Sequence, residues 1–300
     1  MPRIRTLVVV LAGGAGGRLE LLTQERAKPA VSFAGTHRLI DFALSNAANA
    51  GVTDVWVSQQ FNPISLEDHL ANGRPWDLDR TLGGLLLLHP RQGYDERTGF
   101  QRGTADGLWR FAPLIREFGP AALVVVSADA AYAHDYGALV EEHVAHDADV
   151  TLVIFVFTPG AVLDTLEELA GDAGEEGLED LVPRLAAEGR VREHRFGGYW
   201  RDVGTVAAYW QAHSDLLAEV PPLDLDDPDS GGAGDPRRPG RGRPRRADRG
   251  GERRHRPRGP ARRRGARGRA ARRRALPRGG GMREPSSSSI RGAARAPGRG

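Results

Sequence analysis

The chain has 300 residues, enough for one or two domains, and it contains no cysteine. The lack of cysteine excludes a disulfide framework, thiolate chemistry and a cysteine-based metal site. The net charge of +3 hides two opposite parts, since residues 1–229 carry a formal charge of −17 and residues 230–300 carry +20.

No stretch of the chain has the length of a membrane span. The apolar run near the N-terminus is too short for a signal peptide, and no other run approaches the ~18 apolar residues that a span needs. We therefore expect a cytoplasmic protein with no membrane partner.

The first expected element is a strand that leads into a glycine-rich loop. Residues 7–11 form a valine-rich apolar run, which is typical of a buried parallel strand. The loop that follows consists of Gly13, Gly14, Ala15, Gly16 and Gly17. Such a loop lets backbone N–H groups close on an anion, although a simple tight turn has the same composition. Arg18 and Lys28 add positive charge nearby and favour the anion.

Lys28 is the only lysine among the 42 basic residues of the chain. A coding bias toward arginine accounts for most of the scarcity of lysine. A compact ammonium is nevertheless kept at this one position, where the planar fork of an arginine would not be equivalent. Pro29 stiffens the backbone directly after it.

The next unit is predicted to be a helix followed by a second buried strand. Apolar residues recur at helical spacing over residues 38–50, and residues 52–58 have the pattern of a strand. With the first strand they form a βαβ unit with a right-handed crossover. Gln59 and Gln60 follow at the carboxyl end of this strand, where ligands of doubly wound sheets collect, although either is equally an ordinary polar strand end.

These segments together resemble one family. The stretches GGAGGRL, LT, RAKPAVSFAG and RLIDFALSN are similar to the opening of the sugar nucleotidyltransferases, most closely the glucose-1-phosphate adenylyltransferases. The resemblance implies that Arg18, the four glycines of the loop, and Leu11 and Ala12 before them contact the nucleotide. It also implies that Gln59 lies near the base. For Lys28 it leaves two roles open, neutralisation of charge during the reaction and binding of a regulator.

A second motif of this family follows at residues 102–106, which read RGTAD. The resemblance implies that this motif opens a helix near the nucleotide and that Gly103 and Thr104 contact it. Thr104 or Asp106 near a helix start is also ordinary capping chemistry. The residue before the motif is Gln101, where the family has a tyrosine associated with the sugar phosphate.

The two candidate metal ligands are carboxylates. Asp129 follows the clearest buried strand, residues 121–127, and Mg²⁺ takes oxygen ligands at such a position, although a turn or cap would also use an aspartate there. Asp202 lies in GYWRDVGT, residues 198–205, which resembles a family signature. The resemblance implies that both carboxylates hold one Mg²⁺ ion.

Other elements are expected along the rest of the chain. Helices are predicted over residues 64–73, 132–146, 161–170, 180–187 and 206–219, and an apolar segment over residues 82–89. We expect His134, His143 and His146 to be exposed and to bind no metal, and Tyr209 and Trp210 to face the core.

One segment of the family is expected to be missing. In residues 150–157, VTLV resembles one family strand and IFVF resembles a later one, so that several tens of residues are absent near residues 153–155. The resemblance implies that the absent part carries the family's contacts to the sugar phosphate.

The basic tail has no apolar periodicity. The family continues into a β-helix, but residues 230–300 are rich in Arg, Gly and Pro, and we expect them to be disordered. A shifted reading frame in a GC-rich gene would give this composition. The alternative is a genuine polycation, which would bind nucleic acid unspecifically because it lacks interleaved aromatic residues.

The sequence therefore predicts a doubly wound, Rossmann-like α/β domain with a mostly parallel sheet over residues 1–220, and a linker with a disordered tail over residues 221–300. The function implied by the resemblance is transfer of adenylyl from ATP to glucose 1-phosphate with Mg²⁺, in glycogen synthesis, and it leaves a homo-oligomer open. The alternatives are a remnant that only binds nucleotide, an enzyme for another sugar 1-phosphate, and a nucleic-acid-binding protein that acts through the tail.

Overall fold

The computed structural model describes residues 4–90, 99–152, 154–169, 177–189 and 191–225. The chain divides into two units, and all described residues belong to the first, residues 1–242. The expected disordered tail and the junction at residue 153 lie outside the described residues.

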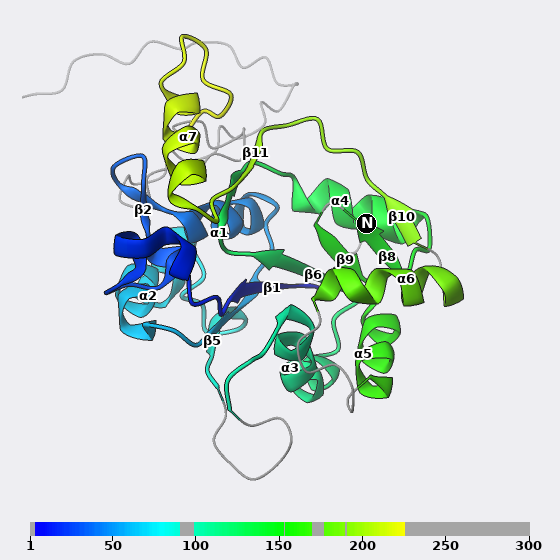
Figure 1. Cartoon of the computed structure of the whole chain (residues 1–300). Coiled ribbons are helices and arrows are strands. Elements are labelled where there is room, and N and C mark those ends of the chain that lie inside the picture. The colour runs from blue at the N-terminus through cyan, green and yellow to red at the C-terminus, as the bar shows by residue number, and fades with distance from the viewer. Residues whose placement is uncertain (1–3, 91–98, 153, 170–176, 190, 226–300) are drawn as a thin grey trace, which may run out of the picture. The chain divides into compact units, whose positions relative to one another are not determined.

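A seven-stranded sheet, ordered β10-β8-β9-β6-β1-β4-β5, forms the centre of the first unit (Figure 1). Its strands are β1 (Thr6–Ala12), β4 (Asp54–Gln59), β5 (Gly84–Leu88), β6 (Ala122–Ser127), β8 (Val150–Leu152), β9 (Phe155–Phe157) and β10 (Val191–Glu193). All of these pairings are parallel except those of β9. The mostly parallel α/β prediction is confirmed.

Two small antiparallel ribbons accompany the sheet. One pairs β2 (Ser32–Phe33) with β3 (His37–Arg38), and the other pairs β7 (Ala130–Tyr132) with β11 (Trp200–Asp202). The second ribbon joins the segment that follows β6 to a segment about 70 residues later in the chain.

Helices lie on both faces of the sheet (Figure 1). They are α1 (Leu39–Asn49), α2 (Pro63–Leu70), α3 (Thr104–Phe118), α4 (Tyr136–Ala145), α5 (Pro159–Glu168), α6 (Leu178–Glu188) and α7 (Val206–Leu216), with 3₁₀ turns η1 (Gly17–Thr23), η2 (Lys28–Ala30) and η3 (Ala71–Trp76). The helix expected over residues 132–146 begins only at Tyr136, because Ala130–Tyr132 pairs with β11 instead.

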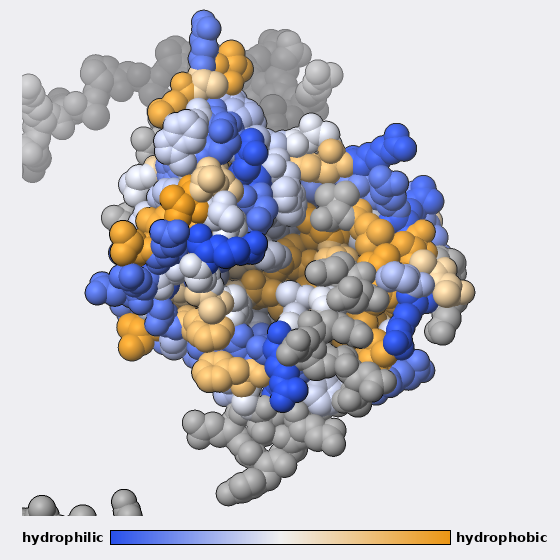
Figure 2. Space-filling model, viewed as in Figure 1, coloured by the Kyte–Doolittle hydropathy of each residue, from blue (hydrophilic) through white to orange (hydrophobic). Residues whose placement is uncertain are grey.

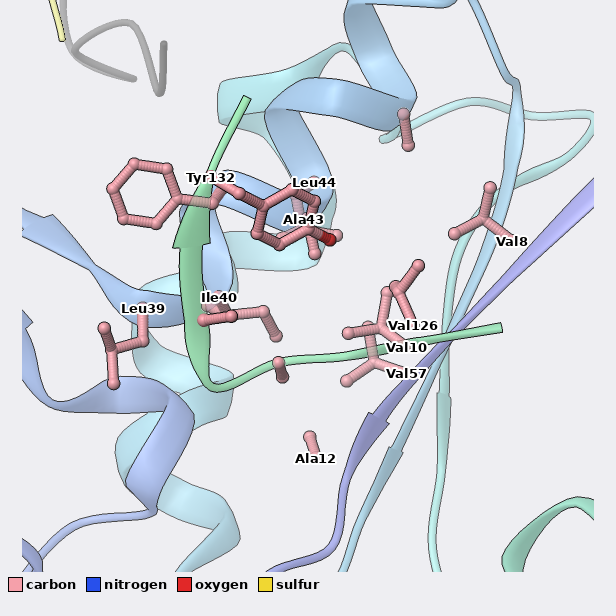
Figure 3. Packing of buried hydrophobic residues seen from close by; sticks show 14 of the residues in the cluster. Val8, Val10, Ala12, Leu39, Ile40, Ala43, Leu44, Val57, Val126 and Tyr132 are labelled. Carbon is pink, nitrogen blue, oxygen red and sulfur yellow. The ribbon is translucent and has the colours of Figure 1, made fainter. Parts of the chain in front are cut away.

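The side chains of β1 alternate between two cores. Val8 and Val10 belong to the cluster beneath α1 and α4, whereas Leu7 and Val9 belong to the cluster beneath α3, α5 and α6. This alternation is what a strand buried on both faces requires. Figure 3 shows the first cluster, in which Val8, Val10, Val57 and Val126 of the sheet gather near residues of α1 and Tyr132.

Strands β8 and β9 pair antiparallel, Val150 with Phe157 and Thr151 with Val156. The two stretches that resemble separate family strands are therefore direct neighbours here. Ile154 directly precedes β9 and is almost fully buried.

Two of the three histidines expected to be exposed are buried. His134 precedes α4 and stacks on Phe196 with ring centroids 4.8 Å apart. His143 is 1% exposed, and its Nδ1 and Nε2 lie 2.9 and 3.3 Å from the hydroxyls of Thr151 and Thr158. Burial lowers the pKa of both imidazoles below the ordinary value. The prediction of exposure was wrong for these two and is confirmed for His146.

The placement of Tyr209 and Trp210 on α7 was half right. Tyr209 packs against the core and donates its hydroxyl to the carbonyl of Ser32 at 2.8 Å, but Trp210 is 67% exposed. Adjacent helical residues point about 100° apart, so both cannot face one core. Figure 2 shows further apolar residues exposed at the outer end of α7, where Leu217 and Val220 lie.

The folded unit extends past the expected boundary at residue 220. Leu223 is 5% exposed and belongs to the core cluster that contains Val8, and Leu225 packs against the same cluster. Among the described residues, no helix is both long and apolar enough to cross a membrane.

We predict that two truncations differ in stability. A chain that ends at Leu225 should keep the thermal midpoint of the full chain. A chain that ends at Pro222 should melt at a lower temperature, since it loses the burial of a leucine, worth about 1.5–3 kcal/mol. Thermal unfolding followed by circular dichroism measures both, and equal midpoints for the two truncations would contradict the packing of Leu223.

We predict that buried His134 makes the protein less stable in mild acid. Its pKa is lowered in the folded chain, so below the ordinary value of about 6.5 the unfolded chain binds more protons, and the free energy of unfolding falls as the pH drops. His134→Phe should therefore lose less stability between pH 7.5 and 5.5 in urea titrations than the unmodified chain. His146→Phe, on the exposed end of α4, is the control, and an unchanged pH slope in His134→Phe would refute the assignment.

Candidate active site

A cavity of about 230 Å³ opens at the carboxyl edge of the sheet, where β1, β4 and β6 end. The ends coincide because Ala12 is in register with Gln59 and Leu11 with Ser127. Eight of the residues predicted to contact the nucleotide or the metal line this cavity: Leu11, Ala12, Gly13, Gly14, Lys28, Gly103, Thr104 and Asp129. Topology therefore gathers residues from three widely separated parts of the chain.

The glycines of the loop have different roles. Gly14 borders the cavity, and a Cβ at this position would meet no atom within 4 Å. Gly16 has φ +70°, and its Cβ would lie 2.9 Å from the Thr23 methyl group. Its carbonyl accepts hydrogen bonds from the N–H of Leu19 and the hydroxyl of Thr23, both at 2.9 Å. Gly16 thus shapes the turn into η1 and, like Gly17, is not part of the cavity lining.

Lys28 and Asp129 form an ion pair inside the cavity. The Lys28 Nζ lies 2.5 Å from Asp129 Oδ2, although the two residues are 101 positions apart. The lysine is 7% exposed, and the hydroxyl of Ser127 donates to the other oxygen of Asp129. A buried ammonium needs such a partner, because an unpaired charge in this environment is costly.

The backbone at Asp202 lies next to the backbone at Asp129. In the β7–β11 ribbon Asp202 pairs with Ala130, and the N–H of Val203 donates to the carbonyl of Asp129 at 2.9 Å. Asp202 is exposed and does not line the cavity itself. A Cβ on Gly204 would lie 2.8 Å from Asp202 Oδ2 and 3.4 Å from Arg18 Nη2, so the side chains of Arg18 and Asp202 both come close to this glycine.

The structure places Gln60, not Gln59, at the cavity. Gln59 is fully buried away from it and donates its Nε2 to Glu67 at 2.8 Å. Gln60 lines the cavity and donates its Nε2 to the carbonyl of Gly13 at 2.6 Å. The sequence-based choice of Gln59 is corrected here. Side chains alternate along a strand, and the face that Gln59 takes is occupied by Glu67 of α2.

The RGTAD segment is fixed mainly by its aspartate. Asp106 Oδ2 accepts from the N–H of Arg102 at 2.8 Å and from Nε of Arg110 at 2.9 Å. Thr104 borders the cavity, and its hydroxyl accepts from the N–H of Leu178 at 2.9 Å. No side chain caps the start of α3. The capping interpretation of Thr104 therefore does not hold, and its hydroxyl ties α3 to the start of α6.

The residues present fit a magnesium ion that is shared with a phosphate. Mg²⁺ is usually bound by one or two carboxylates together with substrate phosphates, and Asp129 and Asp202 supply two carboxylates on adjoining backbone. The Lys28 ammonium against Asp129 shows that this carboxylate accepts a cation. Within the part of the chain that the structure describes, no three His, Asp or Glu side chains are grouped to hold a metal by themselves.

A family model described as nucleotidyl transferase matches residues 7–161 and 154–219. The chain belongs to the nucleotidyl transferase family. Among its relatives are proteins named glucose-1-phosphate adenylyltransferase. That of Thermomicrobium roseum is 37% identical over 74% of this chain and 62% of its own length. That of Fusobacterium nucleatum is 32% identical over 76% of this chain and 71% of its own length.

A further relative of the same name, from Bacillus licheniformis, is 34% identical over 73% of this chain and 69% of its own length. The chain thus spans between about three fifths and seven tenths of the length of these relatives. The alignment with the Thermomicrobium protein runs over 265 residues, but the part of this chain that it covers, 74% of 300 residues, is shorter than that. This relative therefore has residues inside the matched region that this chain lacks.

We predict that two glycine substitutions affect different properties, ATP binding in one case and stability in the other. Gly14→Ala should leave the thermal midpoint unchanged but weaken ATP binding, because the new methyl group enters the cavity. Gly16→Ala should lower the midpoint, because it strains a left-handed residue by about 1–2 kcal/mol and crowds Thr23.

Calorimetric titration with ATP and thermal unfolding separate the two. If Gly14→Ala bound ATP as tightly as the unmodified chain, the loop would not be the phosphate site.

Proposed function

We propose that this chain transfers the adenylyl group of ATP to glucose 1-phosphate, giving ADP-glucose and pyrophosphate, the activation step of glycogen synthesis. The single observation that carries the proposal is the Lys28–Asp129 pair beside the glycine-rich loop, inside a cavity at the carboxyl edge of a parallel sheet. The name shared by the relatives supports the choice of substrates.

The residues suggest how the reaction would proceed. A phosphate oxygen of the sugar attacks the α-phosphorus of ATP, the bond to the bridging oxygen breaks, and pyrophosphate leaves with the bonding electrons. The attacking oxygen is already anionic, so that positioning and charge neutralisation matter more than proton transfer. The backbone at Gly13 and Gly14 would hold the phosphates, and Lys28 would neutralise charge that develops on them.

The remaining charged groups complete the proposed site. Asp129 and Asp202 would hold a Mg²⁺ ion, which when bound neutralises charge on the phosphates and orients them. Arg18, beside Asp202 at Gly204, would contact the triphosphate from the open side. Because ATP and sugar phosphates are metabolites of the cytoplasm, we propose that the protein acts there.

A nucleotide-binding remnant is the second candidate. It is favoured by the pairing of β8 with β9, two stretches that resemble separate family strands, and by the extra residues of the Thermomicrobium relative within the matched region. If the absent part carried contacts to the sugar phosphate, the chain would need a high concentration of glucose 1-phosphate but not of ATP. A third candidate is an enzyme that uses another sugar 1-phosphate. It is tested by replacing glucose 1-phosphate with other sugar 1-phosphates and measuring the pyrophosphate released from ATP.

We predict that the two carboxylates act as a unit. Asp129→Asn and Asp202→Asn should each remove most ADP-glucose formation from ATP, glucose 1-phosphate and Mg²⁺, and the double variant should lose little more, since groups on one cation are non-additive. Asp164→Asn, an exposed residue of α5 that pairs with Arg116, is the matched control and should keep full activity.

Two outcomes would change this account. Sustained turnover in Asp202→Asn would remove that residue from the metal site. No turnover in the unmodified chain, with Mg-ATP still bound in calorimetry, would establish the remnant instead.

A further inference from the structure

Two glutamine side chains join three segments around the cavity. Gln60 Nε2 donates to the carbonyl of Gly13 at 2.6 Å and to the carbonyl of Gln101 at 3.3 Å. Gln60 Oε1 accepts from the N–H of Gln101 at 2.8 Å. Both hydrogens of this amide and one lone pair of its oxygen are therefore used within the protein.

Gln101 is held just as closely. Its Nε2 donates to the hydroxyl of Ser58 at 2.5 Å. Its Oε1 lies where a Cβ on Gly13 would be 3.0 Å away and a Cβ on Gly107 would be 2.9 Å away. The side chain thus lies between the glycine-rich loop and the first turn of α3, close to two residues that have no side chain of their own.

From these contacts we infer that Gln60, which bonds the backbone of Gly13 and Gln101, and Gln101, whose side chain bonds Ser58, together form a latch, which holds the glycine-rich loop against the segment before α3 and fixes the width of the nucleotide cavity. Both are positioning residues. The amide of Gln60 is held by Gly13 and Gln101, so it connects two walls of the cavity. That the cavity holds a nucleotide rests on the proposed function, whereas the hydrogen bonds of the two glutamines do not depend on it.

The latch explains how an exposed glycine loop keeps one shape. Gly13 and Gly14 have no side chains to anchor them, and glycine has the greatest backbone freedom to lose. The Lys28–Asp129 pair and the two glutamines of the latch line the same cavity. A loop already in its binding shape costs less free energy to order when phosphate binds.

Hydrogen exchange of the ligand-free chain tests the latch without any reaction. Gln60→Met and Gln101→Met keep side-chain length but remove the amide. Each should speed exchange of the backbone amides in residues 13–17 about tenfold, the effect of one lost hydrogen bond of average net strength. The double variant should exchange no faster than either single variant, because one broken latch is already open.

Two further variants sharpen the result. Gln60→Glu keeps the acceptor for the N–H of Gln101 but loses the donor to Gly13, so it should loosen residues 13–17 as Gln60→Met does. Gln211→Met, which removes an amide that donates to Asp215 on α7, is the control and should leave exchange at residues 13–17 unchanged. Thermal midpoints of all variants are measured alongside.

Binding gives the second readout. The dissociation constant of ATP should rise about tenfold in both latch variants, and where turnover is measurable KM for ATP should rise while kcat stays within about twofold. Unchanged exchange at residues 13–17 in both Met variants, or additive effects in the double variant, would overturn the latch. Faster exchange with no ADP-glucose formed by the unmodified chain would uphold the latch and refute the proposed reaction.

Discussion

The parallel pairing of β1 with both of its neighbours is the constraint on which the rest of the structure depends. β1 is in register with β4 and with β6 over six residues on each side. Because parallel strands end at the same edge, this register sets the glycine-rich loop, Gln60 and Asp129 side by side. A slip of one residue would move every side chain of β1 to the opposite core, so the two clusters beneath the helices fix the register and, through it, the cavity.

Charge then ties the edge together. The Lys28–Asp129 pair links η2, which comes early in the chain, to the end of β6, and the β7–β11 ribbon adds Asp202 to the same neighbourhood. The chain keeps its one lysine here. The slender ammonium of Lys28 reaches Asp129 from a buried position, and the broader fork of an arginine would need more room. The ammonium of Lys28 and the carboxylates of Asp129 and Asp202 thus lie near the proposed phosphate position.

Most of this arrangement could be predicted from local patterns. Valine-rich strands, the glycine loop and an aspartate after β6 have clear signals, because burial, backbone freedom and strand ends each leave a mark on composition. The side of a strand end is harder to predict, because β4 is buried on both faces and its composition gives no sign of which side chain turns toward the cavity; Gln59 was therefore chosen, whereas Gln60 lines the cavity. The burial of His134 depends on Phe196 from a distant segment, and the ribbon that shortened α4 depends on β11. Such contacts join residues far apart in the chain, so the sequence of either segment by itself does not predict them.

The central claim is that the carboxyl edge of β1, β4 and β6 binds the nucleotide. Its most direct test is a hydrogen-exchange footprint of the full chain with saturating Mg-ATP against the ligand-free chain. We expect slower exchange in residues 11–18, 101–106 and 127–131, which contain most of the residues that line the cavity, and no change in the control segment α4, which borders the starts of β1 and β4. Protection confined to α4, or a binding signal in calorimetry with no protection in those three segments, would contradict the account.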